Sequence, residues 1–207
     1  LCLTTGVQSI DVPDHVLGVD PNIRSDFEGP YDINDGFHET FVTLGYLAAI
    51  TTRVRLRSAV LILPQRQTAL VAKQAAEVDV LSGGRLDLGV GVGWNVVEYE
   101  ALKEDWKTRG ARQTEQLEAM VRLWTEDVVT FEGEFHTLNG VGINPRPLQR
   151  PIPLWFGGSA DAMLRRAARY GAGWIPLGKP DEAAVARLSA LNDYLKAEGR
   201  DPTAFGI

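Results

Sequence analysis

The sequence predicts an α/β protein and, within that class, a (β/α)8 TIM-type barrel that is incomplete at both ends. Three observations lead to this prediction: a strand–helix–strand unit over residues 53–93, the same alternation along the rest of the chain, and glycines that alternate inside a strand. Alternating strands and helices form a parallel sheet covered by helices, either an open doubly wound sheet or a barrel. The nucleotide-binding form of the open sheet needs a glycine-rich turn that opens a helix. No obvious helix follows Gly93, so the barrel is favoured.

The unit over residues 53–93 reads as a strand, a helix and a second strand. Arg53–Pro64 is rich in β-branched and leucine residues, and Thr68–Leu81 has apolar residues at helical spacing. A glycine pair follows this helix, as is common at helix ends. Leu86–Gly93 then alternates strictly between apolar residues and Asp or Gly. The residues that we expect the helix to bury are Val71, Ala75, Val78 and Leu81.

The other elements follow the same alternation. Residues before Gly6 are typical of a helix tail, Gln8–Val12 is a short strand, and Glu39–Ile50 is a helix. The loop Gly18–Gly36 has a length that is usual for a functional lid. Later elements are a connection over Val96–Thr108, a helix over Gln113–Trp124, a hairpin within Val128–Leu138, an extended connector over Asn144–Pro153, a strand at Leu154–Phe156, a helix over Asp161–Tyr170, a strand at Gly173–Pro176 and a helix over Asp181–Glu198 that buries Val185, Leu188, Leu191 and Leu195.

The composition excludes several classes of function. The 207 residues suffice for a single domain over residues 1–207, and the net charge of −6 argues against nucleic-acid binding, which needs clustered Lys and Arg. No apolar run approaches the roughly 18 residues that span a bilayer. Cys2 is the single cysteine, so no internal disulfide forms and a cytoplasmic location is expected. The three histidines lack metal-ligand spacing, so no metal site is expected.

The strand Leu86–Gly93 suggests a site. Its apolar residues would face the helices, while Asp87 and three glycines would face the barrel interior. Glycine weakens a strand, so the three need a reason. They either leave room for a ring or phosphate near Gly91 and Gly93, or they allow tight packing against a bulky neighbouring strand. On the preceding strand, Arg55 is placed to form an ion pair with Asp87 in the interior.

Two further segments contain candidate functional residues. Asp14 and His15 follow the first strand, at the strand end where barrels carry catalytic groups, and histidine is suited to proton transfer. A structural role for the pair is the alternative. Gly157-Gly158-Ser159 precedes a helix and could bind an anion, or Ser159 could simply be the N-cap. His38 and His136 fit no pattern and are expected to be surface or structural residues.

Six segments together resemble the luciferase-like monooxygenase family, and within it the branch of deazaflavin (coenzyme F420)-dependent oxidoreductases. They are PDHV at 13–16, RSAVLILP at 57–64, LSGGRLDLGVGVGWNVVEYEAL at 81–102, TRGARQTEQLEAM at 108–120, VTFEGEFHTL at 129–138 and PIPLWFGGSADAMLRRAARYGAGWI at 151–175. The resemblance implies a barrel that holds a flavin or deazaflavin at its C-terminal mouth. It also implies that the first strand and the last two βα units are absent from this chain.

The resemblance assigns roles to individual residues. His15 and Asp14 would lie near the cofactor ring, with His15 handling protons. A non-proline cis peptide behind the ring would match Ser58-Ala59, with Val60 beside it. The residues that would line the cofactor are Gly91, Gly93, Trp94 and Asn95, and those on its phosphate side are Gly157, Gly158 and Ser159. Some deazaflavin dehydrogenases have an acidic residue where this chain has Trp94, which argues against a sugar-phosphate dehydrogenase.

The expected function is therefore hydride transfer between coenzyme F420 and a small organic substrate. The first alternative is an FMN-dependent monooxygenase on the same barrel, which would activate oxygen. The second is a truncated member that binds no cofactor and serves as a scaffold or subunit. We expect a small-molecule substrate and a homodimer, with neither nucleic acid nor a membrane as partner.

Overall fold

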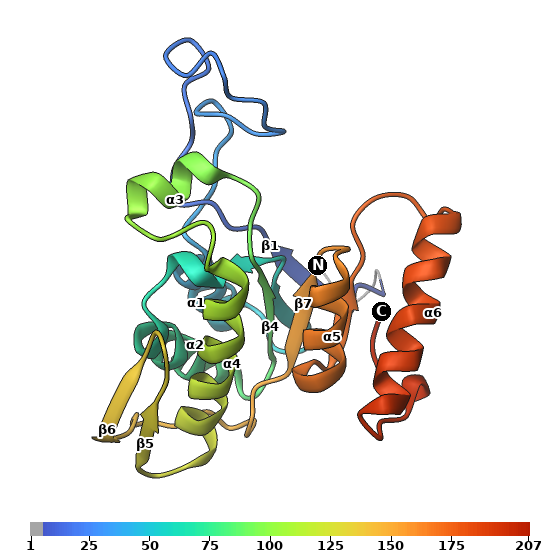
Figure 1. The fold of residues 1–207 in the computed structure, drawn as a ribbon. Helices are drawn as coiled ribbons and strands as arrows, with labels where there is room; N and C mark the ends of the chain where they lie inside the picture. Colours follow the sequence, from blue (N-terminus) through green and yellow to red (C-terminus); the bar gives the residue numbers. More distant parts are fainter. Residues whose placement is uncertain (1–5) are drawn as a thin grey trace.

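The computed structural model describes residues 6–207, so Cys2 and the helix tail expected before Gly6 lie outside the described residues (Figure 1). The main sheet contains β1 (Ser9–Val12), β2 (Arg55–Ser58), β3 (Leu61–Ile62), β4 (Leu86–Gly91), β7 (Leu154–Gly157) and β8 (Gly173–Ile175). The helices are α1 (Thr40–Ile50), α2 (Thr68–Ser82), α3 (Val96–Leu102), α4 (Arg109–Thr125), α5 (Asp161–Tyr170) and α6 (Glu182–Ala197). A separate hairpin is made by β5 (Val129–Glu132) and β6 (Thr137–Val141). Short 3-10 turns span Leu63–Gln65 and Pro202–Ala204.

The order of the strands identifies the architecture. Neighbours in the main sheet run β1-β2-β4-β7-β8, with β3 also paired to β4, and every pairing in this sheet is parallel. Each new strand is thus added on the same side of the one before it. A doubly wound sheet would instead reverse its strand order at a switch point. The prediction of an incomplete (β/α) barrel is confirmed, and within residues 6–207 the sheet remains open.

Helices cover the outside of this sheet, and loops stand over one end of it. Figure 1 shows α3 and the long loop before α1 above the strands, at the end where β4 leads into α3. That end carries the carboxyl termini of the parallel strands. The core between strands and helices is apolar, and its largest fully buried side chains include Trp124, Phe156 and Leu88. No helix within residues 6–207 has the length and apolar character required to cross a membrane.

Side chains and glycines define the helix ends much as the sequence indicates. Glu39, Gln67 and Asp181 precede α1, α2 and α6, and each accepts a hydrogen bond from a backbone N–H of the first turn. Gly83 ends α2 in the left-handed conformation, with φ at 69°, which glycine adopts at little cost. The helices that were predicted therefore begin and end within about two residues of their predicted bounds, except α4, which starts four residues early at Arg109.

Two apolar residues expected inside the core are exposed. Leu81 is 60% exposed and Val185 is 66% exposed. In both helices the residues expected to be buried were three apart at this end of the pattern. They were Ala75, Val78 and Leu81 in α2, and Leu191, Leu188 and Val185 in α6. Because an α-helix has 3.6 residues per turn, two such steps rotate a side chain about 120° away from the buried stripe. The expectation was wrong at both positions for the same geometric reason.

A second error concerns the segment after β4. Residues 96–108 were expected to be a connection, but Val96–Leu102 forms α3. The side-chain oxygen of Asn95 accepts hydrogen bonds from the backbone N–H groups of Val97 and Glu98 and so caps this helix. The absence of a following helix had counted in favour of the barrel. That argument fails, although the barrel itself is established by the strand order.

The expected ion pair in the barrel interior is present. Nε of Arg55 donates to Asp87 at 2.6 Å, and a second guanidinium nitrogen donates to the other carboxylate oxygen. Asp87 is buried, while the Arg55 side chain is 40% exposed on the open side of the sheet. Arg57 pairs in the same way with Asp11 and lies over the ring of Trp155. These polar residues fill the interior below the carboxyl ends of the strands.

Candidate active site

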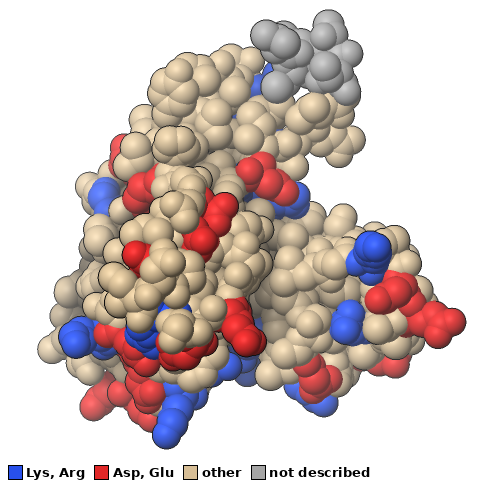
Figure 2. Space-filling view, turned by 90° about the horizontal axis from the view of Figure 1, so that it is seen from above, with Lys and Arg blue, Asp and Glu red and all other residues tan. Residues whose placement is uncertain are grey.

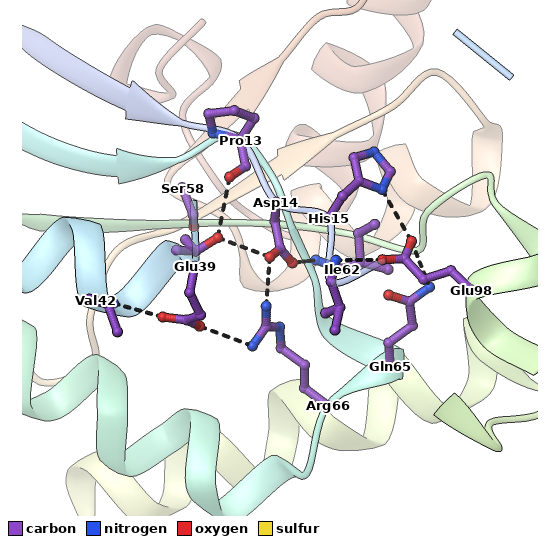
Figure 3. A network of polar contacts seen from close by, with 12 residues as sticks. Pro13, Asp14, His15, Glu39, Val42, Ser58, Ile62, Gln65, Arg66 and Glu98 are labelled. Carbon is purple, nitrogen blue, oxygen red and sulfur yellow. Dashed lines mark hydrogen bonds and ion pairs between the residues drawn. The ribbon is translucent and has the colours of Figure 1, made fainter. Parts of the chain in front are cut away.

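Asp14 ties together the loops at the carboxyl ends of β1 and β3. It lies two residues beyond β1 and is buried. One carboxylate oxygen accepts hydrogen bonds from Thr40 Oγ1 at 2.9 Å and from Arg66 at 2.6 Å, and the other accepts from the backbone N–H of Ile62 at 2.9 Å (Figure 3). With both oxygens occupied, Asp14 is suited to holding this corner in place. A direct catalytic role is therefore not supported by its contacts.

His15 is paired with a carboxylate that the sequence analysis did not single out. Its Nδ1 lies 3.1 Å from Oε2 of Glu98, which comes from α3 (Figure 3). The His15 side chain is 11% exposed and that of Glu98 is fully buried. Nδ1–H donates to the carboxylate, so the proton is fixed on that nitrogen. Among the described residues Nε2 has no hydrogen-bond partner, which leaves it available as a proton acceptor or, when protonated, a donor.

The same carboxylate also holds the chain that follows His15. Oε1 of Glu98 accepts from the backbone N–H groups of Val16 at 2.5 Å and Leu17 at 3.1 Å. Burial acts to raise the pKa of Glu98, but the hydrogen bonds from His15 and these two N–H groups outweigh it, and the pKa lies below its usual value. Glu98 therefore stays ionised at neutral pH and fixes both the loop and the imidazole.

Aromatic side chains surround His15 on its other sides. Its ring centroid lies 4.8 Å from that of Phe37, 5.5 Å from Trp94 and 5.9 Å from Tyr31, the first two edge-on. Phe27 packs against Trp94 in turn. Trp94 and Tyr31 remain more than a third exposed, so the wall is open to solvent on one side. The loop expected to be a lid contributes two of the four aromatic residues, Phe27 and Tyr31, and Phe37 follows it directly.

The non-proline cis peptide lies one bond beyond the expected position. It joins Ala59 to Val60, and Ser58-Ala59 is not cis. The Ser58 side chain is buried and its hydroxyl donates to the carbonyl of Gly89 at 2.8 Å, so it faces the neighbouring strand. Ala59 and Val60 are partly exposed at the strand end. Of the three residues predicted here, these two are accessible from the mouth of the barrel.

Val60 occupies the space left by two of the predicted glycines. A Cβ on Gly91 or on Gly157 would lie 2.7 Å from a methyl carbon of Val60. A Cβ on Gly93 would lie 2.8 Å from Ile62, and one on Gly89 would meet the Ser58 carbonyl oxygen. At these positions the glycines serve close packing between neighbouring strands, the second interpretation above. They also bring β4 and β7 against Val60, which gives the site an apolar floor.

The remaining predicted residues differ in accessibility. The Asn95 side chain is buried as the cap of α3, so it faces the helix. Gly158 has φ at 124°, a conformation reserved in practice for glycine, and its carbonyl accepts from Trp174 Nε1 at 2.8 Å. Ser159 is exposed, and the N-cap of α5 is Ala160, so the alternative that Ser159 caps the helix is wrong.

These contacts bring the predicted residues together at one end of the sheet. Asp14 bonds to Ile62, which packs against Gly93, and Val60 packs against Gly91 and Gly157. From above, Figure 2 shows a notch between the main body and the lobe on the right. On this face Lys and Arg are scattered among acidic residues, without a basic patch. An apolar floor with glycine backbone at its edge fits a flat ring, and an accessible histidine stands near it.

Within residues 6–207, no cluster of three or more His, Cys, Asp or Glu side chains is arranged to hold a metal ion. A cavity of about 310 Å³ does lie beside the site, between the long loop and α3. Its lining residues are Leu17, Gly18, Val19, Asp20, Ile23, Arg24, Ile33, Val97, Glu98 and Ala101. It is mainly apolar, and it touches the dyad of His15 and Glu98 through Glu98.

Comparison with known proteins identifies the family of this chain. A family model described as luciferase-like monooxygenase matches residues 26–207. The chain belongs to the luciferase-like monooxygenase family. An uncharacterized protein of Mycobacterium tuberculosis is 40% identical over 211 residues, which cover 98% of this chain and 71% of the relative. An FMNH(2)-dependent dimethylsulfone monooxygenase of Pseudomonas putida is 33% identical over 80% of this chain and 46% of the relative.

Solved structures of luciferase-like proteins have the same fold. Monooxygenase RslO1 from Streptomyces bottropensis matches with a TM-score of 0.79 at 29% identity, over 95% of this chain and 57% of that one. An F420-dependent secondary alcohol dehydrogenase, in complex with an F420–acetone adduct, matches with a TM-score of 0.78 at 20% identity, over 97% of this chain and 58% of that one. The chain therefore spans little more than half the length of these solved relatives.

Proposed function

We propose that this luciferase-like chain forms the cofactor-binding wall of an oxidoreductase that uses a flavin-type tricyclic ring, with coenzyme F420 as the first choice. The observation that supports this most directly is the dyad of His15 and Glu98 beside an apolar strand end. When bound, such a ring supplies hydride chemistry that no protein side chain provides. The protein supplies position, exclusion of water and proton handling.

Each part of the site has a task in this proposal. Val60 and Ala59 would contact one face of the ring, and the backbone around Gly158 and Ser159 would take its phosphate-bearing side chain. Glu98 orients His15, so that Nε2 holds or accepts a proton at the substrate. Asp14 maintains the distance between the histidine loop and Ile62 through its three hydrogen bonds. The aromatic wall would shield the imidazole from water on the sides that it covers.

The choice of F420 rests on the resemblance of the sequence motifs to the deazaflavin branch. A second candidate, an FMN-dependent monooxygenase, is favoured by one observation: the dimethylsulfone monooxygenase at 33% identity is described as FMNH(2)-dependent. The F420-dependent secondary alcohol dehydrogenase matches at 20% identity, a level that supports the fold alone. The two candidates share the site and differ in whether oxygen is a substrate.

Titration of the purified protein with F420 and, in parallel, with oxidised and reduced FMN distinguishes them. We expect saturable quenching of tryptophan fluorescence by F420, because Trp94 lies at the site. Tight binding of FMN without binding of F420 would contradict the F420-dependent oxidoreductase and support the FMN-dependent monooxygenase. Binding of neither would leave the non-catalytic scaffold. A Gly158→Val variant, which cannot adopt the backbone conformation at that position, should weaken binding of whichever cofactor is used.

Some expectations from the sequence stay predictions. A single domain over residues 1–207, a small organic substrate, a homodimer and a cytoplasmic location belong to this proposal. The homodimer is checked by the mass of the protein in solution, measured by light scattering across a range of concentrations. A monomer at all concentrations would contradict it.

A further inference from the structure

A second cavity lies on the outer side of the protein, apart from the proposed cofactor site. It has a volume of about 260 Å³ and opens between the start of α2, the middle of α4 and the β5–β6 hairpin. Its lining residues are Gln67, Thr68, Ala69, Arg112, Ala119, Leu123, Phe135, His136, Thr137 and Leu138. None of them was assigned a function above, and His136 was expected to be a surface or structural residue.

Three of the side chains around this cavity form a continuous relay. Oγ1 of Thr68 lies 2.6 Å from Nε2 of His136, and Nδ1 of His136 lies 2.8 Å from Oε1 of Glu115. Thr68 and His136 line the cavity, while Glu115 stands behind the imidazole. Hydrolases use the same order of groups to activate a hydroxyl nucleophile: the hydroxyl contacts one nitrogen of an imidazole, and the other nitrogen contacts a carboxylate.

The protons in this relay have one consistent arrangement. Nε2 of Gln116 donates to Thr68 Oγ1 at 3.0 Å, so the Thr68 hydroxyl is left to donate to Nε2 of His136. Nδ1–H of His136 then donates to Glu115. Burial acts to raise the pKa of Glu115, but hydrogen bonds from His136 and from backbone N–H groups outweigh it and lower the pKa. The carboxylate is therefore ionised and holds the imidazole by Nδ1, so that Nε2 faces the Thr68 hydroxyl.

The start of α2 adds donors at the same place. Thr68 is the first residue of α2, and the first backbone bond of the helix runs from Val71 N–H to the carbonyl of Gln67. The Leu70 N–H is taken by the Gln67 side chain. The N–H groups of Thr68 and Ala69 precede these bonds, and both residues line the cavity. Such N–H groups stabilise an oxyanion that develops next to a nucleophile at a helix start.

We propose that Thr68, His136 and Glu115 form a second reactive site, which accepts an acyl group from small uncharged esters. In the first step Thr68 Oγ1 bonds to the ester carbonyl carbon, and His136 Nε2 takes the hydroxyl proton. The bond to the leaving alkoxide breaks, and that proton passes to it, releasing an alcohol. Water, deprotonated by the same nitrogen, then attacks the threonyl ester; the bond from the acyl carbon to Thr68 Oγ1 breaks, a carboxylic acid is released, and the proton passes from His136 Nε2 back to Thr68 Oγ1. The proposal is independent of the cofactor site.

The cavity walls indicate the size and polarity of the acyl compound. Ala119, Leu123, Phe135 and Leu138 make one side of the cavity apolar. Arg112 is already paired with Glu104 at 2.8 Å, so it offers little net charge to an anionic substrate. A short acyl chain on an uncharged alcohol or phenol is the class that fits both features. p-Nitrophenyl acetate is a suitable probe.

A purely structural role is the competing explanation. Glu115 also accepts from the backbone N–H groups of Glu134 at 2.7 Å and Phe135 at 2.9 Å, so the relay anchors the tip of the β5–β6 hairpin. If the relay only anchors the hairpin, mutation of its residues should lower the free energy of unfolding, and no acyl group should become attached to Thr68. The test must therefore read out acyl transfer rather than folding.

The decisive experiment incubates the whole protein with p-nitrophenyl acetate and locates the acetyl group by mass spectrometry of peptides. We expect acetyl on Thr68 of the unaltered protein. Thr68→Val, which keeps the shape of the side chain, and His136→Gln should each lower p-nitrophenol release by about 100-fold, the usual contribution of such groups. Thr68→Ser, which keeps the hydroxyl, should retain activity. Exposed Thr52→Val and His38→Gln serve as matched controls and should leave the rate unchanged.

Two results would overturn the proposal. One is acetyl found on histidine, lysine or the N-terminus but not on Thr68 of the unaltered protein. The other is release of p-nitrophenol that Thr68→Val leaves unchanged. Because the first readout uses the unaltered protein, the outcome does not depend on whether a variant folds.

Discussion

Two histidines of this protein are held in nearly the same way, and they differ in what their second nitrogen meets. In each case Nδ1 contacts a glutamate on a following or preceding helix, at 3.1 Å for His15 with Glu98 and 2.8 Å for His136 with Glu115. Each glutamate also accepts hydrogen bonds from two consecutive backbone N–H groups of a loop. The local device that orients an imidazole is thus used twice.

The surroundings separate the two pairs. The Glu98 side chain is fully buried, whereas that of Glu115 is 14% exposed. Nε2 of His136 contacts the Thr68 hydroxyl, while among the described residues Nε2 of His15 is unbonded beside an aromatic wall. A free Nε2 suits proton exchange with a bound substrate, and a bonded one suits activation of the hydroxyl. Orientation by a carboxylate therefore does not by itself specify the chemistry.

The largest difference between the pairs should appear when each glutamate is removed. Glu98→Ala leaves three part-buried donors without a partner around a side-chain position that is itself fully buried, so we expect it to lower the free energy of unfolding by about 3 kcal/mol. Glu115→Ala leaves donors that water can reach, and about 1 kcal/mol is expected. Urea denaturation followed by circular dichroism measures both. Equal losses would mean that burial does not separate the two sites.

Removal of the imidazoles tests the division of labour. His15→Asn should lower cofactor-dependent turnover by about 100-fold, because a general acid–base group contributes that much or more. His136→Asn should leave the same turnover within about twofold, since its relay serves a different cavity. Steady-state kinetics with F420 or FMN, whichever binds, supplies the measurement. If His136→Asn lowered turnover as much as His15→Asn, the two sites would not be functionally independent.

Acid should weaken both pairs in the same direction. Folding lowers the pKa of Glu98 and of Glu115, so each contributes stability that is complete above the unfolded pKa. That contribution is lost as the pH falls through the folded pKa, below about 4.5. Glu98→Gln should flatten the fall of the unfolding free energy in this acidic range. An unchanged slope would show that Glu98 has the same affinity for protons in both states.

The smallest effect is expected at Gln65. Its Nε2 reaches Glu98 at 3.5 Å, a long contact, and its buried Oε1 has no hydrogen-bond partner within residues 6–207. Gln65→Leu should therefore change the unfolding free energy by less than about 1 kcal/mol. A larger loss, measured by the same urea denaturation, would show that the hydrogen bond from the Gln65 amide to Glu98 stabilises the protein. Gln65 would then help His15 to hold the Glu98 carboxylate.

The sequence was informative about elements and less so about their edges. Apolar residues at helical spacing located the long helices, and alternating apolar residues located the strands. Both patterns reflect the burial of one face of the element. α3 was missed because seven residues give too short a periodic run, although Asn95-x-x-Glu98 has the spacing of a capping box. Even that pattern would have assigned Glu98 to its own helix start. In the structure its side chain reaches the loop after β1 instead.

The sequence predicted where the candidate site lies, but it did not predict which side chains contact each other there. Asp14, His15 and the strand ends were found from where they fall relative to strands, which local sequence reveals. The partner of His15 is 83 residues away in the chain, and no local pattern encodes such a contact. The cis bond was placed one residue too early for a related reason. The methyl groups of Val60 pack against Gly91 and Gly157, and such tertiary contacts are not visible in the local sequence.

The one-directional order of the strands has a consequence for biosynthesis. β2 pairs with β1, β4 with β2, β7 with β4 and β8 with β7, so each strand docks on one made before it. Most sheet pairings therefore join neighbouring units rather than distant ends of the chain, which keeps loop-closure costs low. As the chain leaves the ribosome, every new unit finds its template already in place. Assembly can proceed in the order of synthesis, with each new strand added to the edge that the previous strand leaves unpaired.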